Sequence, residues 1–257
     1  MRTALVRRTV LSASALSLAL LATACGSSGT TDAKDDTKPS ASAPAAPAAQ
    51  AKAKTDAELA GLLVAQADLP DHVLKGATPE EAKAGAGATS DKPACVPLVK
   101  AQSMAAQGAG TGTARVKAVG KPKEAAADAS PEEKAKAAMQ ALGSTATAVT
   151  LESFEGTGAA EAFASLKSAG AACAAGYTAT QDGETGKVTK VAAGTPVTGG
   201  DEALAYTVVG DADGSPFTTQ LVVVRQGNTL ATFSAISLTG TAEQPTAVVA
   251  AQVKKLA

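Results

Sequence analysis

Apolar residues recur three and four positions apart in five segments of the chain, and this spacing places them on one face of a helix. The first segment begins at Thr55 and Glu58, whose spacing is that of a capping box. Its helical pattern ends before Pro70. Another segment begins after Ser130, a residue type that caps helices, and has Pro131 at the first helical position. The pattern predicts helices within residues 55–69, 94–104, 131–143, 157–173 and 245–257.

Five further segments are rich in valine, threonine and leucine, and in several of them apolar and polar residues alternate as in half-buried strands. Turn signals at 211–214 and 226–228 join the later strands, which favours antiparallel hairpins. The order of the elements predicts an α+β fold with a single antiparallel β-sheet of about five strands packed by helices. The expected strands are residues 145–154, 187–193, 202–209, 217–225 and 229–238.

Two stretches between these elements show little periodicity. Residues 68–93 contain many Gly, Pro and Asp residues and are expected to form a loop. Residues 105–129 are rich in Gly, Ala and Lys and are expected to form an irregular insertion. The predicted folded domain extends over residues 55–257.

Residues 1–24 predict a signal peptide. Three arginines precede the apolar stretch 9–24, which is too short to span a bilayer and ends in small residues. The pair Arg7 and Arg8 also occurs in twin-arginine export signals. Because the residues around this pair match that signal poorly, we favour the general secretory route.

The sequence Ala-Thr-Ala-Cys at residues 22–25 resembles the lipobox of bacterial lipoproteins, with Ala22 where that family usually has Leu. The resemblance implies cleavage between Ala24 and Cys25, attachment of lipid to the Cys25 thiol, and a membrane anchor at the new N-terminus. The alternative is a plain secreted protein in which this cysteine has no such role.

Residues 25–54 are expected to form the lipid anchor and a disordered tether. The part after Cys25 contains no Val, Ile, Leu or aromatic residue, so it cannot bury enough apolar surface to offset the entropy of ordering. A flexible chain of this length has an average end-to-end distance of roughly 30 Å. We therefore expect the domain to stand off the outer face of the cytoplasmic membrane, in the cell envelope.

Composition restricts the choice of partners. The formal net charge is −1, and only 2% of the residues are aromatic. Nucleic-acid binding requires a clustered excess of basic residues, and we do not expect it here. The lysines of the middle region alternate with acids and alanines, which is typical of a solvated surface; they are Lys117, Lys121, Lys123, Lys134 and Lys136.

If Cys25 carries lipid, Cys95 and Cys173 remain as two cysteines in an oxidising compartment. We therefore expect a disulfide between them. Cys173 also has the spacing of the apolar face of its predicted helix, which places it toward the core. The alternative is two buried free thiols.

Catalytic and cofactor motifs are weak. His72 is the only histidine, and a metal site with Asp68 and Asp71 is less expected than an exposed loop histidine. Three glycine-containing motifs lack residues that a phosphate, calcium or dinucleotide loop requires. They are GETGKV at 183–188, DADGS at 211–215 and GAGTG at 108–112. We interpret GETGKV and DADGS as turns. We expect no cofactor, no metal and no catalytic residue.

Residues 55–257 resemble the extracytoplasmic sensor-like domains of actinobacteria, typified by the C-terminal domain of PknH-type serine/threonine kinases. The resemblance rests on LVAQADLPDHV, Cys95, LESFEGTGAAEAFASLKSAGAAC, GDEALAYTV and LVVVRQGNTLATFS. It implies a disulfide-stapled α+β domain that binds something outside the membrane. The sequence departs from the kinase sensors in having two domain cysteines instead of four and no kinase domain, so any signalling would pass through a partner.

These observations predict a non-catalytic, lipid-anchored binding or sensor-like module, whose partner is an envelope ligand or another exported protein. A carrier of lipids or glycolipids is the first alternative, and it requires an apolar cavity. A secreted hydrolase that uses carboxylates is the second, with Asp201 and Glu202 or Asp211 and Asp213 as the acids to inspect.

Overall fold

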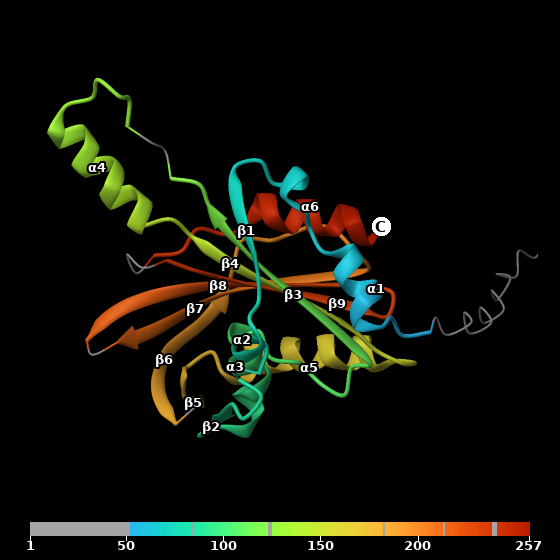
Figure 1. Cartoon of the computed structure of the whole chain (residues 1–257). Helices are drawn as coiled ribbons and strands as arrows, with labels where there is room; N and C mark the ends of the chain where they lie inside the picture. Colours follow the sequence, from blue (N-terminus) through green and yellow to red (C-terminus); the bar gives the residue numbers. More distant parts are fainter. Residues whose placement is uncertain (1–51, 84, 123–124, 182, 213, 238–240) are drawn as a thin grey trace, which may run out of the picture. The chain divides into compact units, whose positions relative to one another are not determined.

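The computed structural model describes residues 52–257, apart from 84, 123–124, 182, 213 and 238–240 (Figure 1). The predicted signal peptide, the cleavage site at Ala24 and Cys25, the lipid attachment at Cys25 and most of the tether lie outside the described residues.

The strands form one antiparallel sheet, which confirms the predicted fold class. They are β1 His72–Gly76, β2 Thr89–Ser90, β3 Gly112–Gly120, β4 Ala146–Ser153, β5 Tyr177–Gln181, β6 Glu184–Ala193, β7 Glu202–Ala212, β8 Ser215–Gln226 and β9 Thr229–Ile236. Their order across the sheet is β1-β3-β4-β9-β8-β7-β6-β5-β2. The expected number of about five strands was wrong, since nine strands occur in the described residues.

Four strands were missed because their signals are short or poor in large apolar residues. Residues 68–93 do not form only a loop, since they contain β1 and β2. Residues 105–129 are not irregular throughout, because Gly112–Gly120 form β3, which pairs with β4 along eight register positions from Gly112 to Val119. Because β3 is rich in small side chains, its sequence gives only a weak strand signal. The stability of this strand depends on its cross-strand partners.

All five predicted helices are confirmed. Two short 3-10 helices, η1 Gln66–Asp68 and η2 Pro93–Cys95, lie beside the longer ones. The α-helices are α1 Asp56–Leu62, α2 Pro79–Lys83, α3 Val96–Gln102, α4 Pro131–Leu142, α5 Gly158–Ala172 and α6 Thr246–Leu256, of which α2 was not expected. None of the helices in the described part of the chain has the length and apolar character needed to cross a lipid bilayer.

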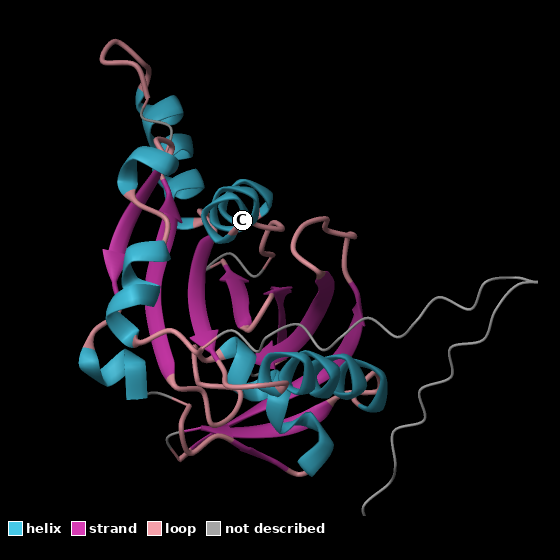
Figure 2. Ribbon diagram, turned by 90° about the vertical axis from the view of Figure 1, so that its right-hand side faces the viewer, coloured by secondary structure: helices cyan, strands magenta, loops and turns pink. Residues whose placement is uncertain are grey.

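Helices cover both faces of the sheet (Figures 1 and 2). On one face, α3 and α5 pack on β8 and β9 around Leu98, Phe163 and Leu221. On the other, α1 and α6 pack around Leu59 and Phe233. We call these two sides the α3 face and the α6 face. The two hydrophobic cores explain why the sheet is apolar on both sides in its middle strands.

The disulfide Cys95–Cys173 is present and confirms the predicted pairing. It joins the end of η2 to the residue after α5, with 5.8 Å between the two Cα atoms. Both half-cystines are fully buried in the core of the α3 face. The bond therefore ties α3 to α5 on that face.

Residues 52–54, which precede the expected boundary at Thr55, also contact the domain. Ala53 is only 4% exposed. The amide nitrogen of Lys54 donates to Ser153 Oγ over 2.9 Å, and Asn228 Nδ2 donates to the carbonyl of Lys52 over 3.1 Å. The chain thus enters the domain at the Ser153 end of β4, where β4 lies beside the start of β9.

Helix α4 projects from the opposite end of the sheet, between β3 and β4 (Figure 1). Its N-terminus has the predicted capping box of Ser130 and Glu133. Most of its described side chains are exposed, and Met139 is 64% exposed.

Candidate functional site

The acids near His72 do not form a metal site. Asp68 accepts a hydrogen bond from the amide of Ala65 over 2.8 Å and pairs with Lys255 at 3.0 Å. The hydrogen bond from the Ala65 amide is the largest cause that lowers the pKa of Asp68, and the hydrogen bond from Lys255 is the second largest. Asp71 is exposed. No group of three potential metal ligands occurs among the described residues.

The acid pair proposed for hydrolysis is engaged elsewhere. Arg225 pairs with Asp201 Oδ2 through Nη1 at 2.9 Å and with Glu202 Oε2 through Nε at 2.7 Å. Asp211 Oδ1 accepts from the amide of Gly214 over 2.6 Å in the turn between β7 and β8, and Asp213 lies outside the described residues. Asp201 and Glu202 thus neutralise an arginine instead of facing a substrate cavity.

The glycine motifs are structural. Gly183, with a φ of 83°, lies in the turn between β5 and β6, and Gly214, with a φ of 86°, lies in the turn between β7 and β8. Gly108 donates its amide to the buried carboxylate of Glu152 over 3.3 Å. The positive φ values account for Gly183 and Gly214, and the contact with Glu152 gives Gly108 a structural role.

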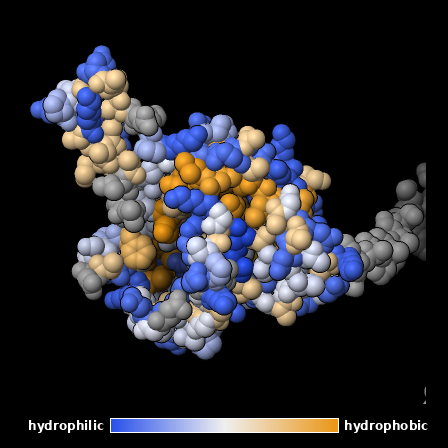
Figure 3. Space-filling model, in the orientation of Figure 1, coloured by the Kyte–Doolittle hydropathy of each residue, from blue (hydrophilic) through white to orange (hydrophobic). Residues whose placement is uncertain are grey.

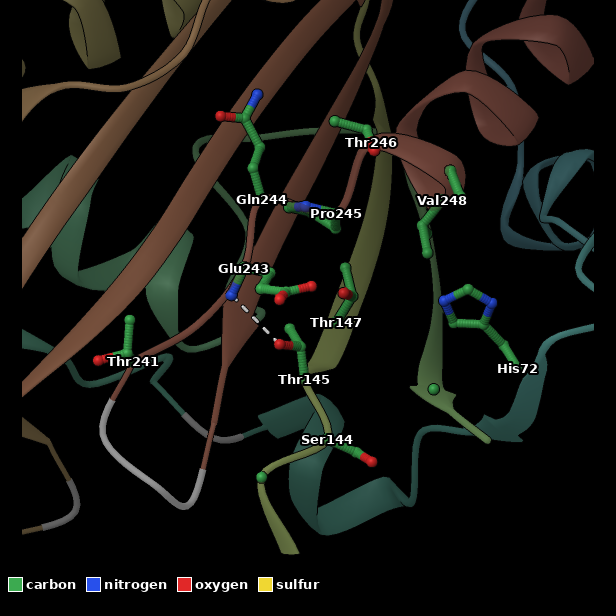
Figure 4. Close-up of a pocket in the computed structure, with 13 residues that line it drawn as sticks. His72, Ser144, Thr145, Thr147, Thr241, Glu243, Gln244, Pro245, Thr246 and Val248 are labelled. Carbon is green, nitrogen blue, oxygen red and sulfur yellow. Dashed lines mark hydrogen bonds between the residues drawn. The ribbon is translucent and has the colours of Figure 1, made fainter. Parts of the chain in front are cut away.

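A polar pocket opens on the α6 face, at the α4 end of the sheet, with a cavity volume of about 670 Å³. His72 points into it from β1 and Glu243 from the segment before α6, with Thr147 between them (Figure 4). The pocket is lined by His72, Gly120, Gly143, Ser144, Thr145, Thr147, Thr241, Glu243, Gln244, Pro245, Thr246, Ala247 and Val248.

The pocket wall is held by its own hydrogen bonds. The amide of Glu243 donates to Thr145 Oγ1 over 3.2 Å, and Gln244 Nε2 donates to the carbonyl of Thr195 over 3.0 Å. In contrast, the Nδ1 atom of His72 is buried and has no hydrogen-bond partner within the described part of the chain. The pocket therefore offers several hydroxyls, a carboxylate and an imidazole to a polar ligand.

A second hollow, which we call the lysine-rimmed groove, lies on the α3 face at the same end of the sheet and has a volume of about 420 Å³. Its floor is largely apolar, and charged side chains stand on one side. The lining residues are Lys75, Glu81, Gln102, Ser103, Met104, Lys117, Val119, Ala146, Thr147, Ala148, Ser234 and Ile236.

Apolar side chains reach the surface in this part of the molecule. Figure 3 shows an apolar patch between α4 and α1, around β1 and the adjacent α6. Val73 on β1 is 40% exposed and Ile236 on β9 is 48% exposed.

The comparisons with known proteins give a structural likeness only. No protein-family model matches the chain, and no curated protein matches its sequence. The chain is similar in structure to the extracellular domain of PknH from Mycobacterium tuberculosis, with a TM-score of 0.48 and 13% sequence identity. The match covers 80% of this chain and 97% of that one. The resemblance predicted from the sequence is confirmed as a resemblance of structure, and what the PknH domain does remains a property of that protein.

Neither hollow was predicted from the sequence. His72 was interpreted as an exposed loop residue, whereas it is half-buried at the start of β1 and lines the polar pocket. Lys117 was interpreted as part of a solvated surface, whereas it is half-buried on β3 and pairs with Glu81. The alternation of polar and apolar residues over 113–119 was the available signal for β3.

Proposed function

We propose that the chain is a non-catalytic binding module of the bacterial cell envelope, anchored through lipid on Cys25 at the outer face of the cytoplasmic membrane. The observation that carries the proposal is the polar pocket. Its volume of about 670 Å³ lies within the range of about 300–1,000 Å³ that is usual for small-ligand sites. The imidazole of His72 and the hydroxyls of Thr145 and Thr147, which line the pocket, support recognition of a hydroxylated ligand by hydrogen bonds.

The contacts around the pocket favour binding over hydrolysis. Hydrolysis by a serine or threonine requires a base within hydrogen-bond reach of the hydroxyl. The hydrogen bonds of the described residues join no hydroxyl to the ring of His72, and Thr145 Oγ1 accepts from a backbone amide. Asp201 and Glu202, the acids expected for carboxylate chemistry, are paired with Arg225.

The position of the pocket suits display away from a membrane anchor. The chain enters the domain beside Ser153, at one end of β4, while Thr145 and Thr147 line the pocket at the other end. The eight residues of β4 separate the two ends by about 25 Å. A tether that leaves the domain near Ser153 would thus leave the pocket open to the envelope.

Ligand-dependent stabilisation tests the binding role. The chain from residue 26 onward is heated with soluble cell-wall glycan fragments, and we expect a saturable rise in Tm. The variants His72→Ala and Thr147→Val should remove the rise, whereas Lys190→Ala, on the exposed face of β6, should keep it. No rise with any fragment, or a rise that both pocket variants retain, would contradict the proposed site.

The anchor is tested separately by cell fractionation. We expect the wild-type protein to partition with membranes and Cys25→Ala to be released to the medium, with an intact mass that lacks the lipid. Equal release of both proteins would contradict the anchor while leaving the pocket untouched.

The lysine-rimmed groove favours a second candidate function, that of a lipid carrier. A carrier needs an apolar surface that shields an acyl chain, and Val119, Met104 and Ile236 line such a surface in the groove.

A further inference from the structure

We propose that the lysine-rimmed groove binds an anionic single-chain lipid, with the acyl chain on an apolar row across four strands and the anionic head at Lys75. The inference deepens the carrier alternative. It does not depend on the polar pocket, which lies on the opposite face of the sheet.

The strand register creates the apolar row. Val73 on β1 lies opposite Val119 on β3, Val119 lies opposite Ala146 on β4, and Ala146 lies opposite Ile236 on β9. Directly paired residues point to the same face of a sheet. Three strand spacings of about 4.8 Å give this row a length of roughly 14 Å.

The row is open because the helices of the α3 face cover other parts of the sheet. Helices α3 and α5 pack over β8 and β9 in the middle of the sheet. At the ends of the row, Val73 is 40% exposed and Ile236 is 48% exposed. Met104, which follows α3, closes one wall of the groove. An apolar side chain or acyl chain placed here would remove this surface from water.

The charges beside the row favour an anionic head. In the next row on the same face of the sheet, Lys75 on β1 lies directly opposite Lys117 on β3, and like charges in this position destabilise a strand pair. Lys117 pairs with Glu81, whose other carboxylate oxygen accepts from the amide of Thr78 over 2.9 Å. Lys75 has no bonding partner among the described residues. The two lysines and Glu81 leave one positive charge, which a carboxylate or phosphate would neutralise.

The size and polarity of the groove fit one acyl chain. Its volume of about 420 Å³ is near the lower end of the range of about 300–1,000 Å³ for small-ligand sites. The row is apolar along its whole length, while the positive charge is confined to the next row. This separation matches an amphiphile with a charged end.

Fluorescence of cis-parinarate, an anionic fatty acid, tests the proposal with the chain from residue 26 onward. We expect saturable binding, with the neutral methyl ester bound about tenfold more weakly because it lacks the charge that pairs with Lys75. Lys75→Glu should weaken parinarate binding by about tenfold or more and leave the ester unchanged. Lys190→Glu makes the same charge change at an exposed residue of β6 and should have no effect.

The apolar row is tested by Ile236→Glu and Val73→Glu, which change half-exposed side chains and should abolish binding of both the acid and the ester. Met139→Glu, on the exposed α4, is the matched control and should bind both like the wild type. Equal binding of acid and ester would overturn the role of Lys75. Binding that survives both row variants, or that is lost in His72→Ala instead, would overturn the groove as the site.

Self-association is measured in the same samples by sedimentation. Should the row instead be covered by a second copy of the chain, dimerisation would increase with concentration, parinarate would not bind the dimer, and the lipid proposal would fail. Glycan-dependent stabilisation in the absence of parinarate binding would also overturn the groove proposal but retain the polar pocket.

Discussion

The side-chain amide of Gln66 donates from Nε2 to the carbonyl oxygen of His72 over 2.7 Å. Its Oε1 accepts from the amide of Leu74 over 3.2 Å. His72 and Leu74 belong to β1, the strand at one edge of the sheet. Gln66 thus satisfies backbone groups that an edge strand would otherwise present to another chain.

Replacing Gln66 by Ala should expose these backbone groups. We expect a loss of about 1 kcal/mol in the free energy of unfolding and a concentration-dependent dimer formed through β1. Sedimentation and urea denaturation measure the two effects. Gln140→Ala, on the exposed surface of α4, is the control and should leave the protein monomeric. A monomeric Gln66→Ala protein at high concentration would contradict the protective role.

The fully buried side chain of Gln252 ties α6 to the end of α1. Its Oε1 accepts from the amide of Val64 over 3.1 Å, and its Nε2 donates to the carbonyl of Leu62 over 2.8 Å. Gln252→Leu keeps the volume but leaves both backbone groups without partners, so we expect a loss of about 2–4 kcal/mol by urea denaturation. Gln140→Leu should cost less than about 0.5 kcal/mol, as is usual for surface substitutions. Similar values for the two variants would argue against the tie.

The disulfide should contribute strongly to stability. Cys95 and Cys173 are separated by 78 residues, and loop-closure theory gives about 4.5 kcal/mol for a loop of this length. We expect the double variant Cys95→Ala, Cys173→Ala to lose about 2–5 kcal/mol in urea denaturation. The unreduced, denatured wild-type domain should show no reactive thiol from these two positions; labelling of both would disprove the bond.

Glu152 should make stability depend on pH. Burial raises the pKa of Glu152 above the ordinary value of 4.5, against hydrogen bonds from the amides of Gln107, Gly108 and Gly110 and the charge of Arg115. The folded protein therefore holds this proton more tightly than the unfolded chain does. The associated stability is complete below pH 4.5 and is lost as the pH rises through the raised pKa.

Glu152→Gln removes this titration. We expect the unfolding free energy of the wild type, relative to Glu152→Gln, to fall as the pH rises from below 4.5 toward neutrality. Urea denaturation across this interval measures the difference. Glu132→Gln, on the exposed surface of α4, reports the general effect of removing one acidic side chain. A pH-independent difference, or one that grows with pH, would show that the sign is wrong.

The sequence alone determined the elements whose signals are local. The capping box at Thr55 and Glu58 and the one at Ser130 and Glu133 fix the starts of α1 and α4, because these hydrogen bonds form within one helical turn. The composition of β8, which is rich in Val and Leu, predicts a strand. The pairing of Cys95 with Cys173 followed from their number and the expected compartment.

Tertiary structure decided what depends on residues far apart in sequence. The segment Gly112–Gly120 becomes β3 because β1 and β4 pair with it on either side, and its small residues gave a weak local signal. The position of Lys75 opposite Lys117 is set by the register of strands about 40 residues apart in the chain. His72 joins Glu243 in one pocket only because β1 and the segment before α6 meet at the same end of the sheet. Helix and turn signals act over a few residues, whereas register and pocket lining arise from contacts between distant segments, which no local pattern encodes.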